Sequence, residues 1–195
     1  MRTVLTFTVL SAVLGVAASA AFAQAPQAPK DASLYVGQAE LEQIMQSVPP
    51  SKEGKPGSFS KRLFAANNSS TAFIRLNAPD QPHAHGIWSE VFIVKEGSGI
   101  LETGGTITGD VTNDSATHKA IAINNDLPPA QSEAAKAAAA ARAAQGDKAG
   151  TDIQGGHKQN VGPGDVILIP AGVAHRWFQV DKPVVYLDIK FPKAQ

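Results

Sequence analysis

The spacing of hydrophobic and polar positions separates a strand-rich body from the segment before it. From about residue 58 apolar and polar residues alternate, which is typical of half-buried strands, and we predict strands at 59–66, 71–77 and 184–191. Residues 38–48 carry apolar side chains at helical spacing, so a short amphipathic helix is expected to pack against the outside of the body. Because turns rather than helices separate the strands, the sequence predicts an all-β fold.

The strand predicted at 184–191 has two chemically different faces. One face carries Val185, Leu187, Ile189 and Phe191, and the other carries Val184, Tyr186, Asp188 and Lys190. Alternation alone assigns neither face to the interior. If the second face lines it, Tyr186, Asp188 and Lys190 contribute to an internal pocket.

A long segment at about 106–160 interrupts the strands. Residues 128–145 within it are rich in alanine, which accounts for 10 of the 18. Alanine favours a helix but provides no broad apolar stripe to bury, and Gly146 is expected to end that helix. We interpret this part as an exposed helix on a surface loop, and the alternative is a lid or a docking element. His118 and His157 have no spaced partner, so both are expected to be ordinary exposed histidines.

Composition limits the chemistry and the number of domains. The 195 residues include 17 basic and 17 acidic side chains, so charge does not indicate a nucleic-acid partner or a membrane surface. There is no cysteine, which excludes disulfides and thiolate catalysis, and any metal must be held by histidine and carboxylate. The length suits one domain, which we place at 58–192 after a linker and short helix at 24–57.

The N-terminal residues resemble an export signal. Arg2 supplies a positive start, residues 4–16 form an apolar core, and residues 21–23 form a small-residue cleavage site before Gln24. The apolar core is too short to span a bilayer. We therefore predict a signal peptide at 1–23 and an exported protein in the bacterial periplasm.

Two histidines and a glutamate stand at a spacing that suits a metal ion. In an extended segment His83 and His85 point the same way, because side chains alternate between faces. Glu90 opens the next apolar run, which is expected to fold back beside the histidines. Two imidazoles and one carboxylate suit a divalent transition metal such as Mn, Fe, Ni or Zn.

A second group of residues lies far along the chain and ends in another histidine. A turn at 162–165 leads into an apolar strand, and Pro170 with Gly172 makes a further turn before His175. On the strand that follows, His175 shares one face with Trp177 and Gln179.

Together these residues resemble the two motifs of the cupins. The first motif matches at His83, His85, Glu90 and Gly97, and the second matches at Gly164, Pro170, Gly172 and His175. The resemblance covers roughly 58–192 apart from the long segment, and Gln179 stands where the family often has Asn. It implies a cupin-type jelly-roll β-barrel and a frequent homodimer. It also implies that His83, His85, Glu90 and His175 converge on one metal ion, with about two coordination positions left open.

Aromatic residues accompany the expected ligands. Phe92 shares the face of Glu90, and Trp177 shares the face of His175, so both are expected to line the pocket together with Gln179. Trp88 lies between the ligands and is expected at the mouth of the pocket. Plain core packing is the alternative for these aromatic side chains.

Three functions fit these features. The first is a metal-dependent enzyme acting on a small organic molecule: an Fe site suits a dioxygenase, Mn suits decarboxylation, and Zn or Ni suits isomerisation or hydrolysis. The second is a metal-dependent protein that binds or senses a small molecule without turnover. The third is a structural or partner-binding protein that the metal only stabilises. Open coordination positions favour the first two, and we favour an oxidoreductase, although no catalytic base is identifiable from the sequence.

Overall fold

A computed structural model gives the architecture of the chain. It describes residues 33, 35–47, 58–66, 69–111, 137, 140–141 and 143–193. The elements are the helix α1 (Gln38–Ser47) and the strands β1 (Ser58–Ala66), β2 (Ser69–Leu76), β3 (His83–Ala84), β4 (Trp88–Thr103), β5 (Thr106–Thr108), β6 (Lys148–Ala149), β7 (Asp152–Gln154), β8 (His157–Val161), β9 (Val166–Ile169) and β10 (His175–Pro192). The predicted signal peptide at 1–23, His118 and most of the alanine-rich stretch lie outside the described residues.

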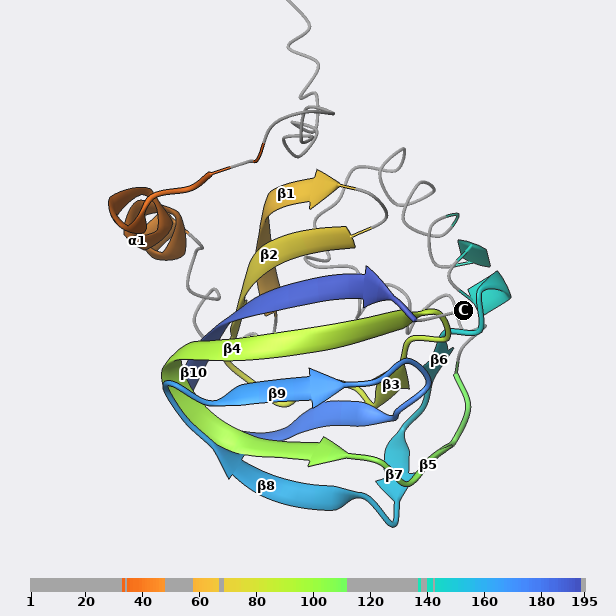
Figure 1. Ribbon diagram of the computed structural model, residues 1–195. Coiled ribbons are helices and arrows are strands. Elements are labelled where there is room, and N and C mark those ends of the chain that lie inside the picture. The colour runs from red at the N-terminus through yellow and green to blue at the C-terminus, as the bar shows by residue number, and fades with distance from the viewer. Residues whose placement is uncertain are drawn as a thin grey trace, which may run out of the picture.

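Two long antiparallel strands organise the fold. β4 and β10 pair along their whole lengths, from His175 opposite Thr103 to Pro192 opposite Trp88. β4 also pairs with β8 and β9, and β10 also pairs with β2 and β3, so the two long strands connect both sides of an eight-stranded sheet. The sheet curls into a barrel (Figure 1), which confirms the predicted all-β barrel architecture.

The long strands bend instead of breaking at glycine. The sequence predicts that Gly97 closes one strand and that residues 100–102 form a hairpin partner, but β4 runs through Gly97 without a turn. Gly97 has φ 78°, and a Cβ there would overlap the carbonyl of Pro183 on β10. A glycine bulge therefore replaces the expected turn, and β10 likewise joins two strands that the sequence separates.

The interior of the barrel is packed with apolar side chains. Its buried members are Leu76, Phe92, Val94, Leu101, Val161, Ile169, Trp177, Val184 and Tyr186. On β4 the buried positions alternate from Glu90 through Phe92 to Val94, so the predicted metal ligand faces the same interior as the core.

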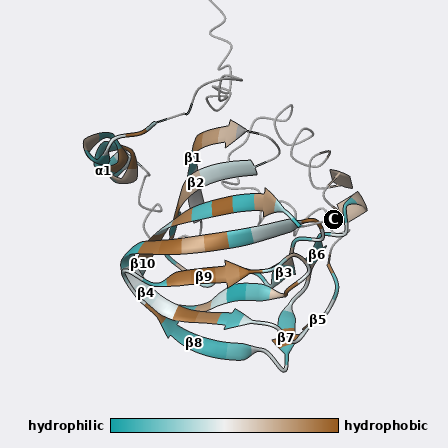
Figure 2. Ribbon diagram, in the orientation of Figure 1, coloured by the Kyte–Doolittle hydropathy of each residue, from teal (hydrophilic) through white to brown (hydrophobic). Residues whose placement is uncertain are grey.

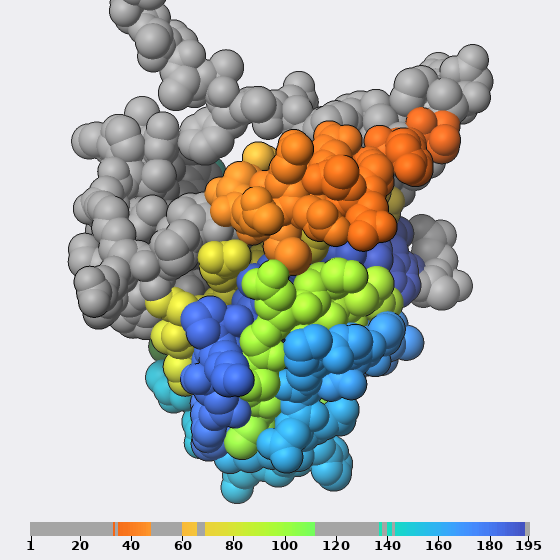
Figure 3. Space-filling view, turned by 90° about the vertical axis from the view of Figure 1, so that its left-hand side faces the viewer, coloured from red at the N-terminus to blue at the C-terminus, as the bar shows by residue number. Residues whose placement is uncertain are grey.

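The outward face of β10 packs against α1. Figure 3 shows the helix on the outside of the molecule. Val185 is buried with Leu63 and Phe73, and Ile44 and Met45 of α1 pack against that group. The helix therefore lies outside the barrel as predicted. Because Val185 faces outward, the face that carries Tyr186, Asp188 and Lys190 lines the interior, which settles the alternative that alternation left open.

The long segment between the motifs is shorter than predicted. β5 lies at its start, and β6, β7 and β8 lie at its end. β6 and β8 belong to the eight-stranded sheet, which therefore extends into the range assigned to the insert, while β5 and β7 pair with one another. β8 is hydrophilic (Figure 2) and mostly exposed, which is why its sequence gives no strand signal. His157 on β8 is exposed as expected, and Gly146 ends a helical stretch with φ 87°. No described helix has the length and apolar character needed to span a membrane.

Candidate metal centre

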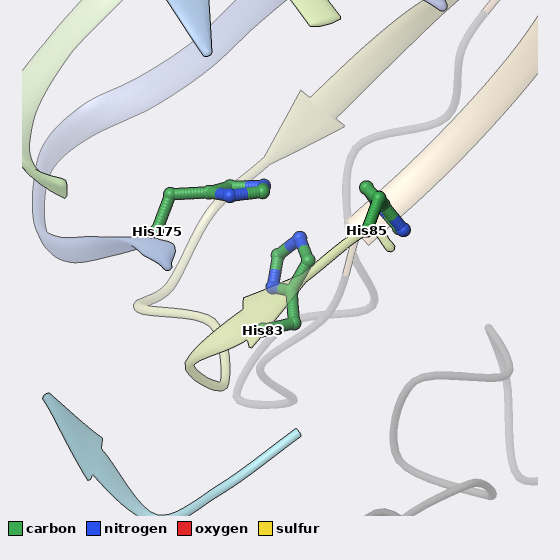
Figure 4. A group of neighbouring side chains, drawn as sticks. All are labelled: His83, His85 and His175. Atoms are coloured by element: carbon green, nitrogen blue, oxygen red, sulfur yellow. The ribbon is translucent and has the colours of Figure 1, made fainter. Parts of the chain in front are cut away.

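Three histidines from two distant parts of the chain, His83 with His85 and then His175, point toward one another (Figure 4). His83 lies on β3 directly opposite His175, the first residue of β10. His85 follows β3, and its carbonyl accepts a hydrogen bond from the N–H of Gly172 in the second motif, at 2.7 Å. The turn of the second motif is thus attached to the backbone of the first, and this contact brings the two groups of predicted ligands together.

The imidazole rings are close enough to share an ion. One ring nitrogen of each of His83, His85 and His175 lies within 4.8 Å of the others. Glu90, which is 2% exposed, joins them from β4: Oε2 is 3.0 Å from His175 Nε2, and Oε1 is 3.4 Å from His85 Nε2. All four predicted ligands therefore lie in one cluster.

The second ring nitrogen of each histidine is held by an oxygen. The Nδ1 contacts are His83 with the Gln81 carbonyl at 2.8 Å, His175 with the Val173 carbonyl at 3.0 Å, and His85 with Asp147 Oδ2 at 3.0 Å. Carbonyl and carboxylate oxygens only accept, so each Nδ1 carries the hydrogen. In the neutral rings Nε2 then carries the lone pair that a metal needs.

Two buried atoms at the centre have no hydrogen-bond partner among the described residues. They are His175 Nε2 and Glu90 Oε2, which lie 3.0 Å apart. In a neutral imidazole with hydrogen on Nδ1, both atoms would be acceptors facing one another, which is unfavourable in a buried place. A cation between them, either a proton or a metal, satisfies both. These residues therefore fit a divalent metal ion.

The charges around the centre favour the same conclusion. Burial raises the pKa of Glu90, but its partners His175, His85 and Lys190 outweigh burial and hold that pKa below its usual range, so Glu90 is a carboxylate. Burial, with the neighbouring His175 and His85, lowers the pKa of His83 well below its usual value. A metal binds histidine as the neutral imidazole and glutamate as the carboxylate, so His83 and Glu90 are both in the form that a metal requires.

Lys190 and Asp188 complete the polar interior. The Lys190 ammonium lies 2.6 Å from Glu90 Oε1 and 3.0 Å from His85 Nε2, and it lies 3.7 Å from Asp188 Oδ2. Burial raises the pKa of Asp188 to about 6, against the opposing effect of Lys190. Sequence alternation had placed these two residues on one face without deciding where that face points.

Asp147 belongs to the centre and was not predicted. Its Oδ2 contacts His85 Nδ1, and its Oδ1 accepts a hydrogen bond from the N–H of Gly86 at 2.9 Å. It directly follows the alanine-rich stretch, and no spacing in the sequence links it to His85, which is 62 positions away. Carboxylates in this position orient a metal-binding histidine and raise its basicity.

Replacing Asp147 by alanine is expected to weaken metal binding without abolishing it. His85 would lose the oxygen that fixes its ring, and outer contacts of this kind typically change metal affinity by about 10- to 100-fold. Titration against a chelator of known affinity measures the change, with Asp147→Asn as the variant that keeps an acceptor oxygen. An unchanged affinity in Asp147→Ala would show that Asp147 does not position His85.

Asp80 is a second unpredicted carboxyl near the centre. Its Oδ1 accepts from the backbone N–H of Trp177 at 2.6 Å, and its own N–H donates to the Trp177 carbonyl at 3.2 Å. Burial raises the pKa of Asp80 to about 7, although the hydrogen bond from Trp177 lowers it.

The raised pKa of Asp80 predicts a pH-dependent stability. The folded state binds this proton more tightly than the unfolded state, so the contribution is full below pH 3.8 and is lost as pH rises through about 7. Solvent screening of the partly exposed Asp80 reduces the free energy of this shift. We therefore expect the stability of Asp80→Asn, measured against the parent, to rise by about 2 kcal/mol over this pH range. Urea unfolding of chelator-treated protein across that range measures the difference. A stability difference between Asp80→Asn and the parent that stays constant with pH would contradict the raised pKa of Asp80.

The predicted pocket residues divide into two groups. Phe92 and Trp177 are buried at 3% and 1% exposure, and the Phe92 ring lies 6.2 Å from that of His175, so both form the core beneath the ligands. Trp88 is half-buried at the start of β4. Gln179 is not brought into the group: the sheet register shifts after Trp177, and the exposed Gln179 amide donates to Asp181. The shift interrupts the alternation that predicted an inward position.

Comparisons with known proteins give remote structural similarities. No family model and no curated protein matches the sequence. KdgF from Halomonas sp. is 13% identical with a TM-score of 0.40, over 73% of this chain and 87% of KdgF. BH2720 from Bacillus halodurans is 14% identical with a TM-score of 0.45, over 85% of this chain and 86% of that protein. A cupin-2 domain containing protein from Shewanella frigidimarina is 15% identical with a TM-score of 0.36, over 73% and 84% of the two chains.

The arrangement of the two motifs in this chain supports the resemblance to the cupins. Both motifs lie on paired strands of one barrel, with His83 of the first opposite His175 of the second. The turn residues of the second motif hydrogen-bond to the backbone of the first. The fold and the two motifs of this chain are therefore similar to those of the cupins.

Proposed function

We propose that this protein is a metal-binding cupin that holds one divalent ion through His83, His85, Glu90 and His175 and acts on a small organic molecule. The observation that carries the proposal is the buried contact of His175 Nε2 with Glu90 Oε2, two atoms without a hydrogen-bond partner among the described residues. The Nδ1–H contacts of the three histidines support it, because they leave each Nε2 available as a ligand.

The surrounding residues prepare this place for chemistry on a small molecule. A divalent metal held here would supply Lewis-acid or redox chemistry. Asp147 holds the ring of His85, and Glu90 remains a carboxylate beside His85 and His175. Phe92 and Trp177 close the barrel beneath the ligands and exclude water from that side. Four protein ligands would leave about two positions of an octahedral ion for the substrate and a second small molecule.

We favour an oxidoreductase of the oxygenase type within this proposal. The first experiment is elemental analysis of protein isolated from its native compartment without added metal. About one equivalent of Fe, the metal that suits oxygen chemistry, would direct the next step to oxygen uptake with phenols, thiols and diketones. One equivalent of Mn, Zn or Ni would instead direct it to decarboxylation, isomerisation or hydrolysis.

The outcomes separate catalysis from binding. Turnover that is lost in Glu90→Gln supports the enzyme. Saturable binding of the same compounds without turnover supports a metal-dependent binding or sensing protein instead. Protein that carries no metal, and takes up none when Fe, Mn, Zn or Ni is added, contradicts the proposal.

We also propose that the protein is exported and works in the periplasm. The proposal rests on the positive start, the apolar core and the small-residue cleavage site within residues 1–23. Mass spectrometry of the periplasmic fraction is expected to find a chain that begins at Gln24. An intact N-terminus on cytoplasmic material would contradict it.

A further inference from the structure

The Lys190 ammonium lies against two of the proposed ligands. Its Nζ is 2.6 Å from Glu90 Oε1 and 3.0 Å from His85 Nε2. With hydrogen on Nδ1, His85 offers the lone pair of Nε2 to this ammonium. Lys190 therefore uses one lone pair from each of two residues that would otherwise hold a metal.

A lysine and a divalent ion cannot both use His85 Nε2, because a neutral imidazole with hydrogen on Nδ1 has one lone pair there. Glu90 has further acceptor lone pairs, but two cations against one carboxylate in a poorly solvated place repel one another strongly. Metal binding at His85 and Glu90 therefore requires the ammonium of Lys190 to leave them. A buried ammonium that leaves one carboxylate needs another partner, because an unpaired buried charge is costly.

Asp188 is placed to receive the lysine. It lies two positions before Lys190 on the same interior face of β10, is 4% exposed, and has Oδ2 at 3.7 Å from Lys190 Nζ. Its other oxygen, Oδ1, is buried and has no hydrogen-bond partner among the described residues. Asp188 thus offers an acceptor that a small rotation of the lysine side chain would reach.

We propose that Lys190 is a counter-cation that competes with the metal: it neutralises Glu90 when no divalent ion is bound, and it moves to Asp188 when one binds. Lys190 therefore sets the metal affinity of the centre from within the barrel. The inference rests on the proposed metal-binding function and adds a positioning role for Lys190 and Asp188 that neither cupin motif contains.

The first test is the metal affinity of Lys190→Met, measured by competition of Co²⁺ or Zn²⁺ with a fluorescent chelator. Met keeps the length of the side chain and removes the charge. We expect metal binding to become tighter by about tenfold or more, because no ammonium has to be displaced. The matched control is Lys182→Met, an exposed lysine eight positions earlier on β10, which changes the net charge equally and should leave the affinity unchanged.

The second test is Asp188→Asn, which keeps the shape of the side chain and removes the carboxylate. In the presence of Lys190 we expect metal binding to weaken by about tenfold, and in a Lys190→Met background by less than about threefold, since the two residues act as a pair. This variant also tests the inference if Lys190→Met fails to fold.

The outcomes distinguish a failure of the lysine competition from a failure of the proposed metal-binding function. If the parent protein binds neither Co²⁺ nor Zn²⁺, the metal-binding function itself is wrong. If the parent binds metal and Lys190→Met binds it equally well or more weakly, the competition is contradicted. If Asp188→Asn weakens binding by the same factor in both backgrounds, Asp188 is not the acceptor of the displaced lysine.

Discussion

Replacing Glu90 by alanine is expected to abolish stoichiometric metal binding. Glu90 is the only carboxylate in the four-residue set, it is 2% exposed, and its two oxygens contact His175 and His85. Losing a direct ligand should weaken binding by more than the loss of an outer contact, which typically changes metal affinity by about 10- to 100-fold. The loss also leaves Lys190 without its closest carboxylate oxygen, at 2.6 Å. His85→Ala is expected to have the same effect on metal content.

The measurement is metal content after dialysis against a weak chelator, together with circular dichroism to show that the barrel is intact. Glu96→Ala is the matched control, because Glu96 lies on the same strand but is exposed. Glu90→Gln keeps the shape of the side chain and should lose metal as well. Full occupancy in Glu90→Ala, with a native spectrum, would remove Glu90 from the ligand set.

Replacing Trp177 by alanine is expected to destabilise the fold by about 3–5 kcal/mol, the usual cost of removing a large aromatic side chain from a core. Trp177 is 1% exposed, and its ring lies 5.7 Å from that of Tyr186 in the interior cluster. It also follows His175 by two positions, so the loss would loosen the strand that carries a ligand.

The neighbouring residue provides the control for this prediction. Phe178 is 37% exposed, and its main contact is the Lys158 ammonium, 3.3 Å from the ring centroid. Phe178→Ala should therefore cost no more than about 1 kcal/mol. Urea unfolding of both variants measures the difference. Equal losses would mean that Trp177 is not the interior residue and that the orientation of β10 is wrong.

The cluster of proposed ligands was predictable because its signal is local and regular. His83 and His85 stand two apart on an extended segment, and period-two alternation puts them on one side whatever the rest of the chain does. His175 was predictable only through the turn before it, which contains Pro170 and Gly172. No local pattern in the sequence indicates that His175 on β10 lies opposite His83 on β3.

Asp147 and Asp80 could not be predicted because their positions depend on tertiary contacts. Asp147 contacts His85 from the end of the alanine-rich stretch. Asp80 accepts a hydrogen bond from the backbone N–H of Trp177, which is 97 positions away. Neither carboxyl belongs to a periodic pattern. Single acidic residues in loops are usually solvated, so sequence reasoning has no ground for selecting them.

The errors about strands came from glycine and from bulges. Gly97 indicated the end of a strand because glycine is common in turns. The positive φ that suits a turn also suits a bulge inside a long strand. The register shift after Trp177 has no sequence signal either, and it turns Gln179 outward although alternation places it beside His175. Alternation therefore holds only as far as the next bulge.

One divalent ion is expected to bind among His83, His85, Glu90 and His175. The most direct measurement is a crystal structure of the metal-loaded protein with anomalous diffraction data at the absorption edge of that metal. We expect one strong anomalous peak bonded to Nε2 of the three histidines and to a Glu90 oxygen, at roughly 2.0–2.2 Å. No peak among these residues, or a peak held by other side chains, would contradict it.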